Sequence, residues 1–199
     1  MNARSGPGWR IGFVLAAAGL LTGGPLHPGG TMAEMLAHPD WLLSHILQLA
    51  GFIAMAAGLW AFAAAVPLPA RSRRWCRLAV GGTILQAIEM AFHAAAMVDH
   101  HNLVSGASTP ILTTHLVMAV TLYPVFALAL TGFIVAAARD RVLGWGAGAI
   151  GIAGAIGQGL SAPLVVGLNI AAARVLFPMI VLVAIWLVIV AITYRPAPD

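Results

Sequence analysis

The sequence predicts an all-α integral membrane protein, and three observations lead to this fold class. The chain has 199 residues, of which 61% are hydrophobic and only 8% are charged. Its mean hydropathy of +0.95 lies far above that of soluble globular proteins. Its long apolar runs suit helices of about 20 residues that cross the bilayer, and they contradict the short alternating strands of a β-barrel. We therefore expect one polytopic domain over residues 1–199, built as a six-helix transmembrane bundle.

Six apolar stretches define the expected helices, at about residues 9–26, 41–66, 76–98, 111–138, 143–162 and 165–193. The first has a short core that follows Arg4 and Arg10 and could equally be the hydrophobic region of a signal peptide. No small-residue cleavage site of the usual kind follows this core closely, so we interpret it as an uncleaved helix.

Charged loops and small residues characterise the later helices. Arg71 to Arg77 separate the second helix from the third, and Arg139 and Arg141 separate the fourth from the fifth. Recurring glycines give the fifth helix a surface for close packing against a neighbour. These glycines are Gly148, Gly151, Gly154 and Gly157. Pro178 should bend the sixth helix, because proline removes a backbone donor.

The arginines predict the orientation of the bundle. The chain carries 10 basic residues, all of them arginine, and its net charge is +4. Every arginine except Arg174 falls in a segment that the six-helix topology places on one side of the membrane. The positive-inside rule makes that side cytoplasmic, with both termini, and we expect the inner (plasma) membrane as the location. Membrane lipid is then the partner that the charge indicates, and nucleic acid is not needed to explain it.

All 7 histidines fall on the opposite, outer side of this topology. We interpret four of them as outer-loop or helix-end residues: His27, His38, His100 and His101. The other three, His45, His93 and His115, each lie roughly one turn inside a helix at similar depth. Glu89 precedes His93 by four residues, so both share one face of the third helix. A polar stripe of this kind must face protein or water rather than lipid.

The three inner histidines and Glu89 form a candidate transition-metal site. Imidazole and carboxylate suit Zn, Cu or Fe, and three histidines leave one coordination position open. Nearby thioethers favour copper. They belong to Met90, Met97 and Met118. Glu89 is interpreted as a fourth ligand, a hydrogen-bond acceptor behind a ligand, or a catalytic proton-transfer group.

Haem b is the main alternative cofactor. His45 could serve with His93 or His115 as the axial pair, and Arg174 could bind a propionate. Arg174 is expected near the outer end of the sixth helix, where it would pair with Asp99, with Glu89 or with an anionic ligand. In this arrangement Glu89 and the third histidine have no assigned role, so we rank haem second.

The leading functional expectation is a membrane metal-dependent oxidoreductase or electron-transfer component. Its substrate would be lipid-soluble or a small molecule on the outer side, and a homo-oligomer or another membrane protein is a possible partner. An ion, proton or metal transporter is a weaker alternative, because polar residues do not continue through the arginine-bearing half. A non-catalytic assembly protein would need no metal. A ligand set does not by itself specify a reaction.

Overall fold

The computed structural model describes residues 8–195, and every regular element in that range is helical. Five helices are long and apolar enough to cross a membrane. They are α3 (Asp40–Ala65), α4 (Ala70–Ala95) with its extension to Ser105, α6 (Pro110–Arg139), α7 (Trp145–Ala162) with its extension to Gly167, and η3 (Ala171–Met179) continued by α8 (Ile180–Thr193). The expected first span is α1 (Gly8–Gly23), which is apolar but has only 16 residues.

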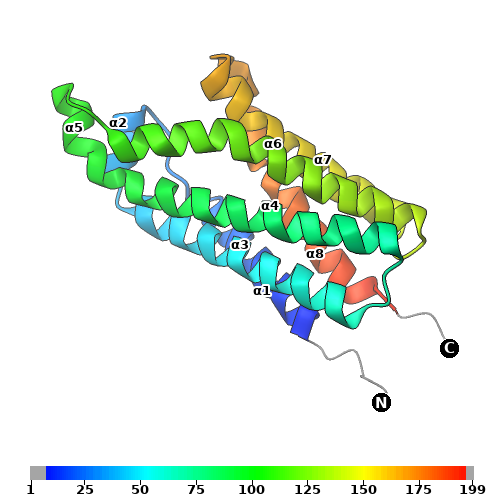
Figure 1. Cartoon of the computed structure of the whole chain (residues 1–199). Helices are drawn as coiled ribbons and strands as arrows, with labels where there is room; N and C mark the ends of the chain where they lie inside the picture. The colour runs from blue at the N-terminus through cyan, green and yellow to red at the C-terminus, as the bar shows by residue number, and fades with distance from the viewer. Residues whose placement is uncertain (1–7, 196–199) are drawn as a thin grey trace.

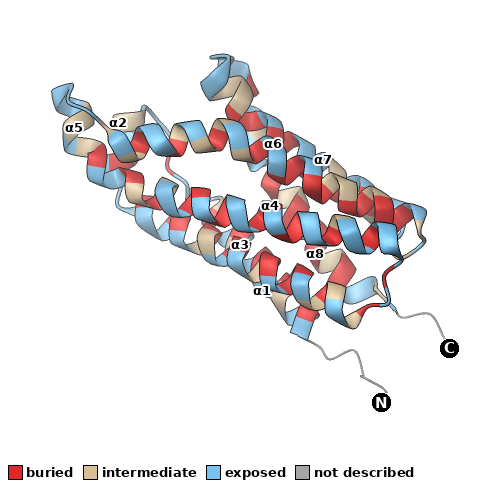
Figure 2. Cartoon of the chain, viewed as in Figure 1, coloured by how far each residue is buried: buried red, intermediate tan, exposed pale blue. Residues whose placement is uncertain are grey.

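Six helices form a closed ring (Figure 1). Going round the ring, α1 packs on α3, α3 on α4, α4 on α6, α6 on α7, α7 on α8, and α8 back on α1. Large buried side chains fill its centre, and Figure 2 shows the buried positions along the inward helix faces. They include Phe13, Phe52, Phe62, Phe126, Phe133 and Trp186. The short α1 is therefore an integral part of the bundle, because it closes the ring between α3 and α8.

Several helix ends differ from the sequence-based expectation. The last helix was expected from residue 165, but the chain leaves the α7 extension at Gly167 and re-enters a helix only at Ala171. Asn169 has a positive φ of 54°, which an α-helix does not allow. The expected outer loops also contain two short helices, α2 (Met32–Ala37) and α5 (His100–Ser105). Helices of 6 residues are too short to show the apolar periodicity that identifies the longer ones.

Glycines bring α1 and α3 close together. A Cβ added at Gly12 would lie 2.7 Å from Cα of Gly58, and one at Gly19 would lie 2.6 Å from the carbonyl oxygen of Leu47. On the other side of the ring, α7 presents Gly151 and Gly154 to α8, as the sequence pattern predicted. Small residues of this kind let helix backbones approach closely, which stabilises helix pairs in membranes.

We predict that Gly19→Ala destabilises the bundle, because the new methyl group would collide with backbone of α3 rather than with a movable side chain. Overpacking of this type costs about 1–3 kcal/mol. The matched control is Gly81→Ala on α4, where an added Cβ meets nothing within 4 Å. Thermal unfolding of the purified protein should show a lower transition temperature for the first variant only. Equal transition temperatures would contradict the close α1–α3 contact.

Both ends of the described chain lie at one end of the bundle, together with the arginine-rich connections (Figure 1). Arg10 donates to the carbonyl oxygens of Ala191 at 2.7 Å and Tyr194 at 2.8 Å, which ties the start of α1 to the end of α8. Arg71 forms an ion pair with Asp140, and the Ser72 hydroxyl donates to the same carboxylate at 2.6 Å. We call this the arginine end, and the end with α2 and α5 the histidine end.

The Asp140 contacts predict a pH-dependent contribution to stability. The hydrogen bond from Ser72 and the Arg71 guanidinium hold the pKa of the Asp140 carboxyl below its ordinary value. The stabilisation is therefore complete above the ordinary carboxyl pKa of about 4 and is lost as the pH falls through the lowered value. Asp140→Asn should lower the unfolding temperature at neutral pH, and the gap to the wild type should shrink in acid. A gap that does not change with pH would contradict this assignment.

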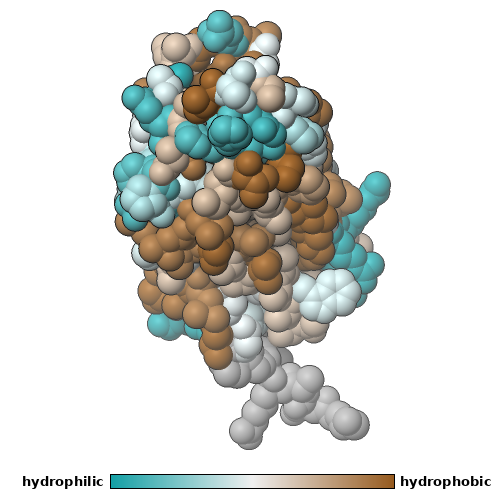
Figure 3. Space-filling view, turned by 90° about the vertical axis from the view of Figure 1, so that its left-hand side faces the viewer, coloured by the Kyte–Doolittle hydropathy of each residue, from teal (hydrophilic) through white to brown (hydrophobic). Residues whose placement is uncertain are grey.

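The outer faces of the helices are apolar. Large exposed hydrophobic side chains project from α3, α6 and α8, among them Ile53, Trp60, Leu128 and Ile192. Figure 3 looks onto the histidine end, where hydrophilic side chains gather in the upper part and hydrophobic side chains cover much of the body below. Together with the five long apolar helices, this surface indicates a multi-pass membrane protein.

Candidate metal centre

The structure brings together the three histidines that the sequence placed at similar depth. His45 projects from α3, His93 from α4 and His115 from α6, and all three meet inside the histidine end of the ring. The ring centroids of His45 and His93 are 4.1 Å apart, and those of His93 and His115 are 3.8 Å apart in a stacked pair. His45 and His115 are buried, with 0% and 4% relative exposure. The three rings converge because each histidine lies about one helical turn inside the same end of the bundle, so the three side chains are at similar depth.

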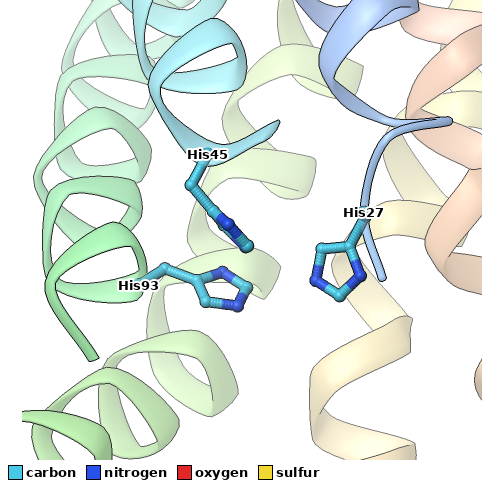
Figure 4. Close-up of side chains that lie close together, drawn as sticks. All are labelled: His27, His45 and His93. Atoms are coloured by element: carbon cyan, nitrogen blue, oxygen red, sulfur yellow. The ribbon is translucent and has the colours of Figure 1, made fainter. Parts of the chain in front are cut away.

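His27 joins the cluster from the connection between α1 and α2. Its ring centroid lies 4.9 Å from that of His45 and 5.8 Å from that of His93, and the three rings point toward one another in Figure 4. From the sequence, His27 was expected to be an outer-loop residue and not a metal ligand. No periodicity could have identified it, because its position depends on how the connection folds back over the end of α3.

Three of the four histidines have their Nδ1 atom engaged by a fixed oxygen. The partners are the Pro28 carbonyl for His27 at 2.9 Å and the Trp41 carbonyl for His45 at 2.5 Å. For His115 the partner is Oε1 of Glu89 at 2.7 Å. A backbone carbonyl can only accept, so Nδ1 of His27 and of His45 carries the proton and Nε2 keeps a free lone pair. An ionised Glu89 carboxylate would give His115 the same tautomer. Metal-binding histidines in proteins are oriented by the same kind of contact.

Glu89 is fully buried and both of its oxygens are used. Oε1 accepts from His115, and Oε2 accepts from the side-chain amide of Gln86 at 2.8 Å. His93 Nδ1 lies 4.0 Å from Oε1, beyond hydrogen-bonding distance. Of the expected roles for Glu89, this geometry fits that of a hydrogen-bond acceptor that fixes the orientation of His115.

Some buried polar atoms of the cluster have no partner within the described part of the chain. They are Nε2 of His45, Nδ1 of His93 and Oε1 of Gln86. A buried nitrogen without a partner costs free energy, so such atoms in a native protein call for an explanation. Binding an ion through His45 Nε2 would remove one of these deficits.

Two overlapping groups of side chains could hold an ion. The first consists of His27, His45 and His93, and the second of Glu89, His93 and His115. Within each group, one ligand atom per residue lies within 4.8 Å of the others. The geometry thus places three possible ligand atoms close together in each group.

Trp41 forms a wall of the site. Its ring centroid lies 4.2 Å from that of His45 and 5.2 Å from that of His93. Its Nε1–H donates to the Ala94 carbonyl at 3.2 Å, which fixes the indole between α3 and α4. The indole and the apolar helix faces limit the access of water to the imidazoles, and this strengthens electrostatic interactions among them.

The structure does not bring Arg174 into the cluster. Arg174 lies exposed on η3, and within residues 8–195 it forms no ion pair with Glu89 or Asp99. Asp99 instead accepts a hydrogen bond from the backbone N–H of Leu112 at 2.8 Å in the first turn of α6. The expected pairing of Arg174 with these carboxylates was wrong, because the break before Ala171 places η3 on a separate corner of the bundle. Its cofactor-binding role stays a prediction.

No family model matches the chain, and neither the curated proteins nor the solved structures contain a match. Function is therefore inferred from the chemistry of the site.

Proposed function

We propose that the protein is an integral membrane metalloprotein whose histidine cluster binds one transition-metal ion, Cu, Zn or Fe. The ligands are His45, His93 and His115, with His27 as an additional ligand from the loop. Glu89 orients His115 through its Nδ1–H. The metal centre acts as an oxidoreductase or electron-transfer site on a lipid-soluble or outer-side small molecule.

The observation that supports metal binding most directly is the orientation of the rings. In three of four histidines, a fixed acceptor engages Nδ1 and leaves Nε2 as the free ligand atom. A histidine that serves only as an interhelical hydrogen-bonding residue needs a single partner and no neighbouring imidazole. His93 has three other imidazole rings around it, those of His27, His45 and His115, and such a cluster fits a ligand shell better than independent hydrogen bonds.

We propose a single ion because the two possible ligand groups share His93. One lone pair of a neutral imidazole binds one ion. The two groups would then describe two positions of the same ion, with His93 a ligand in both. The position near His27 is closer to solvent, and the position near Glu89 is more deeply buried.

The same distances favour a metal ion over haem b. A haem macrocycle must fit between its two axial imidazoles. His45 and His93, one of the two expected axial pairs, have ring centroids 4.1 Å apart, so their rings are in direct contact. In the other expected pair, His45 and His115, both rings contact the ring of His93, which lies 3.8 Å from that of His115. Haem binding would require these helices to separate, and Arg174 is not positioned beside the cluster.

A transport function receives less support from the packing. Toward the arginine end, the interior of the ring beyond Gln86 is filled by apolar side chains such as Phe126, Leu130 and Phe133. Thr83, the next buried polar residue on α4, donates to the Ala79 carbonyl of its own helix. An ion or proton path across the bilayer needs polar groups through its full length.

We also propose that the arginine end faces the cytoplasm and that the protein lies in the plasma membrane, as the positive-inside rule predicts. After replacement of Cys76, the single cysteine, Ser105→Cys and Gly144→Cys place one thiol at each end of the bundle. An impermeant thiol reagent should label position 105 and not position 144 in intact cells. Labelling of position 144 alone would reverse the orientation.

The metal proposal is tested on the purified wild-type protein. Elemental analysis should find about one transition metal per chain, as expected from a shared ligand set. An absorption spectrum then separates the alternatives, because a Soret band would identify haem and d–d or charge-transfer bands would identify Cu or Fe. Protein that stays metal-free after incubation with each candidate ion would exclude the metalloprotein and leave the assembly role.

A further inference from the structure

A second feature, at the opposite end of the molecule, is independent of the metal centre. A shallow groove runs along the start of α4, lined by Ala70, Arg73, Arg74, Arg77 and Leu78. An adjoining hollow shares Ala70, Arg74 and Leu78 with it and adds Arg71 and Trp75. Arg74 therefore lies at the centre of a continuous cationic surface.

The four arginines of this surface differ in the partners that they already have. Arg71 is paired with Asp140, and Arg73 donates to the Leu68 carbonyl at 3.1 Å. Arg74 and Arg77 are exposed and form no ion pair or side-chain hydrogen bond within residues 8–195. Two guanidinium groups, three residues apart on the same helix face, thus keep all of their donors available.

The lining of the groove is both cationic and apolar. Leu78, next to Arg77, is 47% exposed, and Trp75 lies partly exposed beside it. Tryptophan is enriched where a helix enters the headgroup region of a bilayer, and the apolar part of α4 begins at this level. Among the described residues, no acidic side chain lines either hollow. A ligand for this surface therefore carries negative charge at one end and hydrocarbon at the other.

We propose that this groove binds an anionic phospholipid. Arg74 and Arg77 hold the phosphate, because the planar guanidinium presents paired donors that match phosphate oxygens. Leu78 packs against the upper part of an acyl chain. A zwitterionic lipid has the same phosphate, but its ammonium group would meet no carboxylate in the groove. The site therefore prefers phosphatidylglycerol to phosphatidylcholine.

The charge pattern favours lipid over an acidic soluble partner. Basic clusters next to a transmembrane helix attract anionic headgroups. A soluble acidic protein would have to cover Leu78 and Trp75, which face the membrane boundary in a multi-pass arrangement.

The test compares two double variants with the same change of charge at the same end of the bundle. Arg74→Gln with Arg77→Gln removes the free guanidinium groups, whereas Arg139→Gln with Arg141→Gln removes two arginines that line neither hollow. Phosphatidylglycerol is titrated into each detergent-solubilised protein. Lipid-bound species are counted by native mass spectrometry, and the thermal shift is recorded in parallel. Phosphatidylcholine and inorganic phosphate are titrated as separate arms.

We expect at least a tenfold weaker apparent affinity for phosphatidylglycerol in the Arg74/Arg77 variant and less than a twofold change in the Arg139/Arg141 variant. Equal loss in both variants would show that affinity follows net charge and would overturn the site. No preference of the wild type for phosphatidylglycerol over phosphatidylcholine would also overturn it. Equal stabilisation by inorganic phosphate would identify a free-anion site instead of a lipid site. The unfolding temperature without added lipid verifies that each variant is folded.

Discussion

His93→Ala should abolish stoichiometric metal binding. His93 is the only residue common to both possible ligand groups, and its ring contacts both His45 and His115. Removing it takes the shared ligand away from both positions of the ion. His45→Ala and His115→Ala each remove one histidine ligand but leave His93 in place, so the affinity should fall by about tenfold or more rather than vanish. Elemental analysis and competition with a chelator measure both effects.

The matched control for these variants is His100→Ala. His100 lies at the same end of the bundle, at the start of α5, but belongs to neither ligand group. Its replacement should leave metal content and affinity unchanged. If His93→Ala keeps full occupancy while its unfolding temperature stays normal, the cluster is structural and the proposed metal site fails. If the His93→Ala protein does not fold, His93→Gln, which has a polar side chain of similar length, is used to measure metal content and affinity instead.

Helix geometry predicted that three of the histidines lie at one depth in the bundle. His45, His93 and His115 lie on three different helices, yet a rise of about 1.5 Å per residue from each expected helix start places them at one depth. The structure brings these three rings into contact. Glu89 followed from its four-residue spacing to His93, but its hydrogen bond runs to His115 on α6, and spacing within one helix cannot reveal that partner.

The parts that the sequence did not predict depend on loops and on backbone breaks. His27 reaches the cluster because the connection after α1 folds back toward α3, and no repeat marks such a path. Arg174 was expected on a continuous helix that starts near residue 165, whereas the interruption before Ala171 moves it to another corner. The closure of the ring by α1 also depends on glycine contacts with α3, which only the three-dimensional arrangement identifies.

Glu89→Gln should leave the fold intact and weaken metal binding by roughly 10–100-fold, as is usual for the hydrogen-bond partner of a metal ligand. The contacts of Gln86 give the reason for expecting an intact fold. Glu89 Oε2 now accepts from the Gln86 amide nitrogen, and the Gln86 amide oxygen is buried without a partner among the described residues. In Glu89→Gln, the new amide N–H₂ group would face the Gln86 N–H₂ group, and both are donors. A flip of the Gln86 amide turns the Gln86 oxygen toward the new N–H₂ group and restores the hydrogen bond.

The loss of affinity in Glu89→Gln then reports the missing negative charge behind His115, because position and hydrogen bonding are preserved. A carboxylate raises the basicity of the imidazole that it binds, whereas an amide oxygen only orients it. Glu89→Leu removes both contributions and leaves His115 Nδ1 buried without an acceptor, so its unfolding temperature should also fall. Chelator competition and thermal unfolding, measured on both variants, separate charge from orientation. If Glu89→Gln binds metal as tightly as the wild type while Glu89→Leu does not, Glu89 acts through orientation alone.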